Sequence, residues 1–346
     1  MSSADGERLH RASFVLDLHT HGPGFLPPPF GAVWRAGVGA PTEQGFDTLR
    51  AGGVDAVVAS ALGDPIVTRC HLGRSPWAAV DAQLHRIERQ VVDAGAIVAS
   101  SVEDLVAARA GGRPAVLLGL EGADAMGDDI DLVDAWHNRG VRLIGVVHLG
   151  DNTLGTTCLP WQRYVGPLPV RRRSRSGLTA LGHRVVARLN RLGVLVDLAH
   201  GDRSTLLDIA AATTAPVVSS HSGARAVQDF PRYLGDDELR AIAATGGLVG
   251  LWPYRNRRRG VRDLPELMAH ARHIADTIGP EHLALGTDTN GLPGAMVGFG
   301  GGADLSRVTV ALLDAGFDRT EVTGILGGNA LRVLQRVEEH ASSPPS

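Results

Sequence analysis

Residues 15–24 read VLDLHTHGPG, a short apolar run that ends in two histidines and is followed at once by glycine and proline. On an extended strand the side chains at positions i and i+2 point to the same side, so His19 and His21 would project together from the end of a strand. Neutral imidazole is a common protein ligand for zinc and similar ions. The stretch therefore predicts a strand that delivers part of a metal site, whose other ligands must come from elsewhere in the chain.

Short apolar runs of the same kind recur along the chain and are separated by helix-like segments. They are four to eight residues long and rich in Val, Ile and Leu, as expected for strands buried on both faces of a parallel sheet. Eight runs lie at residues 14–18, 54–60, 115–121, 141–148, 194–200, 216–221, 247–252 and 282–288, and AIVAS at 96–100 is a ninth, shorter candidate.

Amphipathic segments fill the spaces between the runs. Residues 77–93 and 178–192 carry apolar side chains at helical spacing, and Gly193 is placed to end the second helix. The segments ELRAIAA and LPELMAHARHIADTIG follow the same pattern. Eight strands that alternate with helices predict a (β/α)8 TIM barrel. The alternative, a doubly wound open sheet, lacks the G-x-G-x-x-G fingerprint after its first strand.

Length and composition limit the class of protein. A chain of 346 residues with 44% hydrophobic residues suits one barrel, which we place at residues 13–338, after a polar segment at 1–12 and before a disordered tail at 339–346. The net charge of −3 and the 4% aromatic content argue against a nucleic-acid or membrane partner. The first residues contain no apolar signal region, so we expect a cytoplasmic protein, with Cys70 and Cys158 as free thiols.

The residues at the ends of the apolar runs are those that carry chemistry. Barrel enzymes assemble their sites from the C-terminal ends of the strands, so these side chains would meet at one end of the barrel. A single buried histidine is more often a satisfied core residue, and this interpretation suffices for the other nine histidines. It does not account for all seven strand-end residues at once: His19, His21, Glu121, His148, His200, His221 and Asp288.

Such a set of side chains suits a dinuclear metal site. Imidazoles and carboxylates can hold two divalent ions, and a carboxylate such as Glu121 can bridge them. Two ions about 3.5–4 Å apart can share a hydroxide and polarise a carbonyl group. The imidazole-rich set favours zinc, although manganese and iron also fit. An aspartate at a strand end can carry the proton to the leaving amine, so the pattern indicates metal-dependent hydrolysis.

Longer stretches resemble the renal (membrane) dipeptidase family of the amidohydrolase superfamily. The resemblance runs in order over nearly the whole chain, through GGVDAVVAS, LLGLEGAD, GVRLIGVVHLGDNTLG, DDELRAIAATGGLVGL, LALGTDTNG and LGGNALRVL. The pair NRLGVLVDLAH and PVVSSHS is its most distinctive part. The resemblance implies an amidohydrolase-type barrel, two zinc ions, a small dipeptide as substrate and a homodimer. It also implies tolerance of glycine or a D-residue at the C-terminal position of that dipeptide.

The resemblance also implies a role for each site residue. His19 and His21 would bind one ion, His200 and His221 the other, and Glu121 would bridge the two. His148 would stabilise the developing oxyanion, and Asp288 would be the general acid and base. The remaining substrate contacts would be Arg232, which would hold the terminal carboxylate, and Tyr254 and Gly291, which would border the substrate.

The chain departs from the family pattern at two positions. The family usually has His-x-Asp on the first strand, where this chain has His21, and a second aspartate where this chain has Asn290. Both differences make the cluster less acidic, which can change the affinity for the metal and the choice of metal. They bear more on the identity of the substrate than on the hydrolytic chemistry.

Two other functions and one surface feature stay open at this point. The site could open a lactone or a cyclic amide, or the barrel could be a metal-binding module without activity, although such a module would need neither His148 nor Asp288. The basic runs at 171–176 and 255–262 are interpreted first as solvated loop charge. The alternative is that they attract acidic substrates to the barrel.

Overall fold

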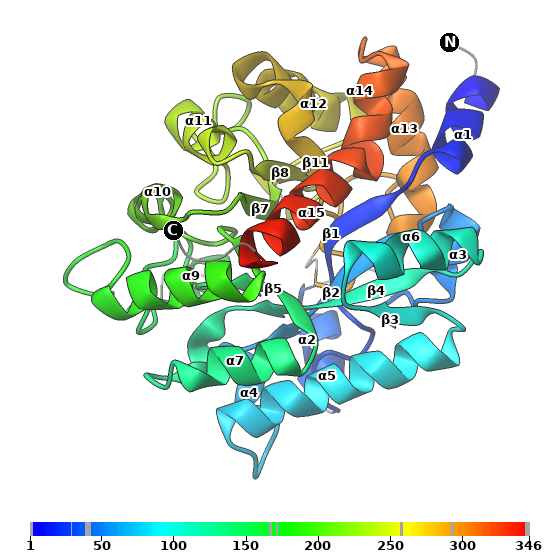
Figure 1. Cartoon of the computed structure of the whole chain (residues 1–346). Coiled ribbons are helices and arrows are strands. Elements are labelled where there is room, and N and C mark those ends of the chain that lie inside the picture. Colours follow the sequence, from blue (N-terminus) through cyan, green and yellow to red (C-terminus); the bar gives the residue numbers. More distant parts are fainter. Residues whose placement is uncertain are drawn as a thin grey trace.

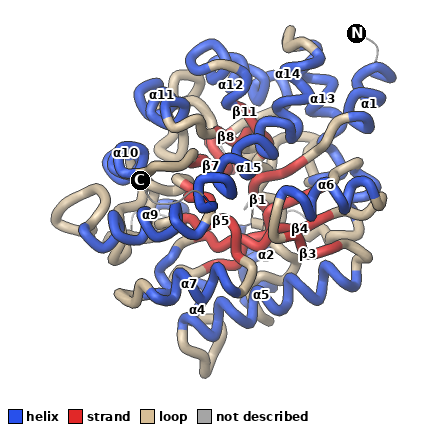
Figure 2. The backbone as a smooth tube through the Cα atoms, in the orientation of Figure 1, coloured by secondary structure: helices blue, strands red, loops and turns tan. Residues whose placement is uncertain are grey.

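The computed structural model describes residues 3–28, 30–38, 43–165, 168–170, 172–256, 259–291 and 294–342. Eight parallel strands form a closed barrel at the centre, and helices surround it (Figures 1 and 2). The predicted (β/α)8 barrel is therefore confirmed. Its strands are β1 Leu16–Thr20, β2 Ala56–Leu62, β4 Ala115–Glu121, β5 Val141–Gly145, β6 Leu195–Asp197, β7 Val217–Ser222, β8 Leu248–Leu251 and β11 Leu283–Leu285.

The ring closes because β2 pairs with β4 along the full length of β4. Around the barrel the order is β2, β1, β11, β8, β7, β6, β5 and β4. The ninth predicted strand is present as β3 Ile97–Ala99, and it pairs with the first half of β4, whereas β5 pairs with the second half. A two-stranded hairpin that the sequence did not predict, β9 Arg255–Asn256 with β10 Arg259–Gly260, follows β8.

Three strands end three residues earlier than predicted. The runs predicted to reach His148, His200 and Asp288 end as strands at Gly145, Asp197 and Leu285. His200 and Asp288 have φ angles of 68° and 55°, in the left-handed region that no strand residue adopts. These side chains therefore lie on the first turns of the loops that follow the strands.

The predicted helices are present, with side-chain caps that fix their starts. Ser75 accepts a hydrogen bond from the Ala78 amide at the start of α5 Pro76–Asp93, and Thr179 caps α9 Ala180–Leu192 in the same way. Gly193 ends α9 in the left-handed conformation, as predicted. The other helices are α1 Ser3–Ala12, α2 Phe30–Val38, α3 Thr48–Gly52, α4 Pro65–Thr68, α6 Val102–Ala110, α7 Asp131–Asn138, α8 Gln162–Val165, α10 Arg203–Ala212, α11 Asp236–Ala244, α12 Leu264–Ile278, α13 Leu305–Asp314, α14 Arg319–Thr323 and α15 Asn329–Ser342.

The strands bury both of their faces. One core lies between the strands and the surrounding helices, and a second fills the barrel with side chains such as Leu16, Leu18 and Leu143. Helix α15 belongs to the second core through Val333 and Val337, and it lies across one end of the barrel (Figure 1). Because α15 continues to Ser342, residues 339–342 of the predicted tail are helical, and residues 343–346 lie outside the described part of the chain.

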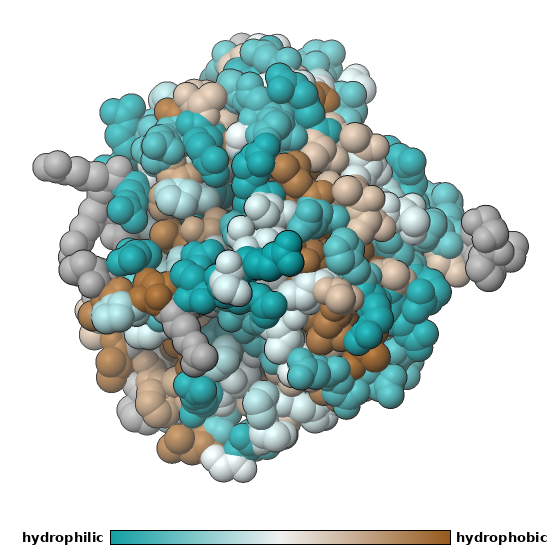
Figure 3. Space-filling model, turned by 90° about the vertical axis from the view of Figure 1, so that its left-hand side faces the viewer, coloured by the Kyte–Doolittle hydropathy of each residue, from teal (hydrophilic) through white to brown (hydrophobic). Residues whose placement is uncertain are grey.

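The surface mixes polar and apolar side chains. On the face shown in Figure 3, the apolar side chains form small patches that polar side chains separate. Among the described residues, no helix combines the length and the apolar character needed to cross a bilayer.

Two glycines beside β7 generate a prediction about stability. A Cβ atom added at Gly250 or Gly286 would lie 1.8 or 1.7 Å from the Ser220 carbonyl oxygen, which the backbone cannot accommodate without moving β7. Gly286→Ala should lower the free energy of unfolding by about 2–3 kcal/mol. Gly150→Ala is the control, since a Cβ at Gly150 meets no atom within 4 Å. Chemical denaturation measures both, and equal stability of the two variants would contradict the prediction.

Candidate metal centre and active site

The carboxylate of Glu121 lies at the end of β4 and at the centre of five histidines. Each histidine presents its Nε2 atom to a carboxylate oxygen, although the five come from four other strands and their loops. Glu121 and all five histidines are less than a tenth exposed. The Nε2 atoms lie 2.9 Å from the nearer Glu121 oxygen in His200, 3.4 Å in His21, and 3.5 Å in His19, His148 and His221. The fold thus brings together these six predicted site residues.

His19 and His21 form one side of the cluster with Glu121. The Nδ1 atom of His21 lies 2.9 Å from the Ser60 carbonyl oxygen and donates to it, so Nε2 is the ring nitrogen that faces the carboxylate. The Nε2 atom of His19 is buried and has no hydrogen-bond partner among the described residues. A buried nitrogen without a partner is costly, and a bound cation would satisfy it. These two residues with Glu121 form one of the candidate ligand groups of the structure.

His200 and His221 form the other side of the cluster. Their Nε2 atoms are 3.2 Å apart, so two ring nitrogens converge on one point near Glu121. The Nδ1 atom of His221 lies 2.9 Å from the Ser220 hydroxyl, which in turn donates to Asp197 Oδ2 at 2.5 Å. With Nδ1 engaged in this series of hydrogen bonds, the Nε2 lone pair of His221 is free to bind a cation. Sequence reasoning missed Ser220 and Asp197, although each lies within three residues of a predicted ligand.

The ionisation states suit ligands of a cation. Burial lowers the pKa values of His200 and His221 well below the usual value, which keeps both imidazoles neutral. Burial alone would raise the pKa of Glu121, but the neighbouring imidazoles hold it well below its usual value. Burial would lower the pKa of His21, whereas hydrogen bonds to Asp288 and Glu121 raise it to about 10. A divalent cation would take the place of that proton.

His148 differs from the other four histidines in its partner. Its Nδ1 atom lies 2.7 Å from Asp64 Oδ2, a carboxylate that sequence reasoning did not single out. Burial alone would lower the pKa of His148, but the charges of Glu121 and Asp64 raise it. His148 can therefore carry a proton at the edge of the cluster.

Asp288 lies between His21 and Trp252. Its Oδ2 atom accepts a hydrogen bond from the Trp252 indole at 3.2 Å, and its Oδ1 atom is 3.5 Å from His21 Nε2. Gly291 packs against Asp288 and His21, since a Cβ at this position would lie 2.2 Å from Asp288 Oδ1 and 2.5 Å from the His21 ring. The absence of a side chain at Gly291 therefore leaves room for the two functional groups. Contact between Gly291 and a substrate stays a prediction.

Arg232 lies over the ring of the same indole. Its guanidinium carbon is 4.8 Å from the centroid of the Trp252 ring, and its side chain is buried. Nε of Arg232 has no hydrogen-bond partner among the described residues. Tyr254 stacks on Trp252 with the ring centroids 4.3 Å apart, and Tyr164 packs against this aromatic cluster. The sequence prediction included Arg232 and Tyr254 but missed Trp252 and Tyr164.

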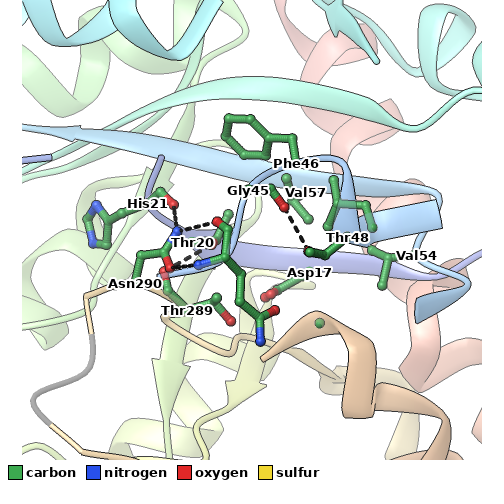
Figure 4. Close-up of a pocket in the computed structure, with 13 residues that line it drawn as sticks. Asp17, Thr20, His21, Gly45, Phe46, Thr48, Val54, Val57, Thr289 and Asn290 are labelled. Atoms are coloured by element: carbon green, nitrogen blue, oxygen red, sulfur yellow. Dashed lines mark hydrogen bonds between the residues drawn. The ribbon is translucent and has the colours of Figure 1, made fainter. Parts of the chain in front are cut away.

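The Asn290 side chain points away from the metal cluster. Its amide nitrogen donates to the carbonyl oxygens of His21 at 2.6 Å and Gln44 at 2.9 Å, and its Oδ1 atom accepts from the Gln44 amide at 2.8 Å. Figure 4 shows Asn290 beside His21 in the small pocket that these bonds border. The asparagine therefore joins the end of β1 to a neighbouring loop rather than changing the charge around Glu121.

The basic runs are described only in part. Arg171, Arg257 and Arg258 lie outside the described residues. Arg172 donates to the Thr157 carbonyl oxygen and pairs with Asp151 at 3.0 Å, so this arginine fastens the loop that follows β5.

Comparison with known proteins identifies the family. The sequence model of the membrane dipeptidase family (peptidase family M19) matches residues 4–346. The chain belongs to the membrane dipeptidase family. Dipeptidase aclJ of Aspergillus oryzae is 31% identical over 236 residues, which are 67% of this chain and 54% of that protein. Dipeptidase 3 of Mus musculus is 31% identical over 234 residues, which are 65% and 45% of the two chains. The chain thus spans about half the length of the curated relatives it matches.

Solved structures share the fold of this family member over almost its whole length. The probable dipeptidase PvdM from Pseudomonas aeruginosa superposes with a TM-score of 0.82 at 21% identity and covers 98% of this chain and 99% of its own. A metallo peptidase from Rhodobacter sphaeroides, liganded with a phosphinate mimic of the dipeptide L-Ala-D-Ala, gives 0.77 at 24% identity, with 94% and 99% covered.

Asn290 generates a prediction that separates a structural role from a role in the metal cluster. Asn290→Asp would place a carboxylate against two carbonyl oxygens, so the free energy of unfolding should fall by about 2–3 kcal/mol. The metal content per folded chain should not change, because the side chain faces away from Glu121. Chemical denaturation and elemental analysis measure the two quantities. The control is Asn138→Asp at the exposed end of α7. A gain in bound metal with unchanged stability would contradict the prediction.

Proposed function

We propose that this chain is a metal-dependent dipeptidase that hydrolyses the peptide bond of small dipeptides. The observation that carries the proposal is the Trp252 indole, which holds Arg232 over its ring and Asp288 at its nitrogen, beside the Glu121 cluster. A dipeptide has a free carboxylate and a free amine a few bonds on either side of its only peptide bond. The buried guanidinium of Arg232 and the carboxylate of Asp288 both contact the rigid Trp252 ring, and they complement these two charges.

The residues around Glu121 fit two divalent cations. We assign His19 and His21 to one ion, His200 and His221 to the other, and Glu121 to both. The unpartnered Nε2 of His19 and the imidazole-rich donor set support this assignment, with zinc as the favoured metal. When bound, such cations would supply Lewis acidity, which would favour loss of a proton from the attacking water and polarisation of the scissile carbonyl group.

Side chains of the protein supply substrate binding, stabilisation of the oxyanion and proton transfer. Arg232 would hold the terminal carboxylate of the dipeptide and so set the position of the peptide bond. The Nε2–H of His148 would donate to the carbonyl oxygen as negative charge develops there. Asp288 would hold the free amine and carry a proton to the leaving nitrogen. Burial excludes bulk water from these groups, which strengthens each of the electrostatic contacts.

We also propose that the enzyme hydrolyses dipeptides with glycine or a D-residue at the C-terminal position. The Rhodobacter sphaeroides protein that shares the fold is liganded with a mimic of L-Ala-D-Ala, which supports testing such substrates first. Tyr254 and Gly291 are the residues that we expect to border the substrate.

Metal content and turnover test the proposal together. The purified protein should contain about two divalent ions per chain and release amino acids from L-Ala-Gly and L-Ala-D-Ala. Glu121→Gln should lose at least one ion and lower kcat at least about 100-fold, because the central charge is gone. Glu238→Gln, which changes a buried glutamate on α11, is the matched control and should retain both ions. Full turnover by protein stripped of metal would reject a metal-dependent reaction.

Arg232 distinguishes a dipeptidase from a lactone or cyclic-amide hydrolase. Arg232→Met should raise KM for dipeptides by about 100-fold, because a charged hydrogen bond to the carboxylate is lost. Arg225→Met changes a partly exposed arginine on the same loop and should leave KM within about threefold. Steady-state kinetics on dipeptides and on their C-terminal amides measure the effect. A wild-type protein that opens lactones or cyclic amides but cleaves no dipeptide would overturn the proposal.

A further inference from the structure

Asp64 lies behind His148, on the side away from Glu121. It follows β2 and comes from a part of the chain that contributes no predicted metal ligand. Its side chain is 1% exposed, and its Oδ2 atom is 2.7 Å from His148 Nδ1. The opposite ring nitrogen, His148 Nε2, is 3.5 Å from Glu121 Oε2. The imidazole is thus held between two buried carboxylates.

The two oxygens of Asp64 have separate tasks. Oδ1 accepts hydrogen bonds from the amides of Ile66 at 2.8 Å and Val67 at 3.2 Å, which caps the start of α4. Oδ2 is the atom that contacts His148. Since a backbone amide can only donate, Oδ1 is the acceptor in the bonds to Ile66 and Val67, and these bonds fix the orientation of the carboxylate. The helix therefore determines where Oδ2 lies.

The proton between Asp64 and His148 then belongs to the imidazole. With Asp64 as the acceptor, Nδ1 of His148 carries the hydrogen, and the ring cannot turn over without losing this bond. Nε2 is left as the atom that faces the centre of the site. A carboxylate that accepts from one ring nitrogen in this way fixes the orientation of the imidazole and therefore the direction of its second nitrogen.

We propose that Asp64 is a positioning residue that accepts the hydrogen bond from Nδ1–H of His148 and so holds the ring with Nε2–H directed at the substrate carbonyl oxygen. The proposal rests on the proposed peptide-bond hydrolysis, because it acts through the oxyanion contact of His148. Asp64 itself touches neither the substrate nor a metal ligand.

Asp64→Asn is the decisive variant, because asparagine keeps Oδ1 for the cap of α4 but turns an amide N–H toward His148. Nδ1 must then accept instead of donate, so the imidazole loses its Nδ1 proton and the charge that goes with it, and Nε2–H becomes a weaker donor to the carbonyl oxygen. We expect kcat to fall by about 10- to 100-fold, with KM within about threefold and unchanged metal content. The matched control is Asp124→Asn, which changes a partly buried carboxylate of the same region whose hydrogen-bond partner is Asn152 rather than the imidazole. It should leave kcat within about threefold.

Two further measurements separate positioning from a general loss of structure. In protein labelled with ¹⁵N-histidine, the Nδ1 resonance of His148 should change from the protonated to the unprotonated range in Asp64→Asn. In a single-turnover double-mutant cycle with excess enzyme, Asp64→Asn should have no additional effect once His148→Gln is present. An additional loss in that background, an unchanged resonance, or kcat within threefold of wild type would overturn the proposal. If the wild type cleaves no dipeptide, the proposed function fails, and the ¹⁵N spectrum still decides the role of Asp64.

Discussion

The structure depends on one interaction, the burial of an ionised Glu121 carboxylate among five imidazoles. A buried carboxylate is very costly unless opposite charge and hydrogen-bond donors surround it. No single strand can supply such a shell, because its side chains on one face are about 6–7 Å apart. The closed barrel solves this problem by bringing the ends of several parallel strands to one point. The same convergence that compensates the charge of Glu121 also creates a site for cations.

Three buried aspartates hold the histidines in place around this centre. Asp17 accepts from the amides of His19 and Thr287, and Asp197 accepts from the amides of Ala199 and Ser220. Each joins the end of one strand to a neighbouring strand or loop, and each lies two or three residues before a histidine of the cluster. Asp64 applies the same principle from a helix cap. Burial raises the pKa of Asp17 to about 6, so its amide and hydroxyl donors only partly offset the desolvation of the carboxylate. The site is rigid because the backbone, and not only the side chains, is hydrogen-bonded to these carboxylates.

The sequence predicted the parts of the molecule that follow from local pattern. Apolar runs in a regular order with helices determine the barrel, and side chains at the ends of several of these runs meet in one cluster because parallel strands all point the same way. The strand ends were predicted too long at His200 and Asp288, since hydropathy carries no information on their positive φ angles. Asp64, Trp252 and Ser220 were missed because their partners lie 84, 36 and 23 residues away in the sequence. Arg232 was found through the family resemblance alone, since no periodicity marks a functional arginine in a loop.

His21 makes contacts with the surrounding fold that an aspartate at this position could not make, so it does more than replace one metal ligand by another. Its Nδ1 atom donates to the Ser60 carbonyl oxygen on β2, its backbone oxygen accepts from Asn290, and its ring lies against Gly291. An aspartate at this position has no proton to give to Ser60, and it is shorter than an imidazole, so it would leave that carbonyl oxygen without its donor. The two departures from the family pattern, His21 and Asn290, are thus joined by a hydrogen bond and belong to one local arrangement. With this arrangement Glu121 is the only carboxylate among the five assigned ligands, and the ligand set carries one negative charge fewer than a His-x-Asp site. We therefore expect the centre to hold cations more through the number and direction of its imidazoles than through charge.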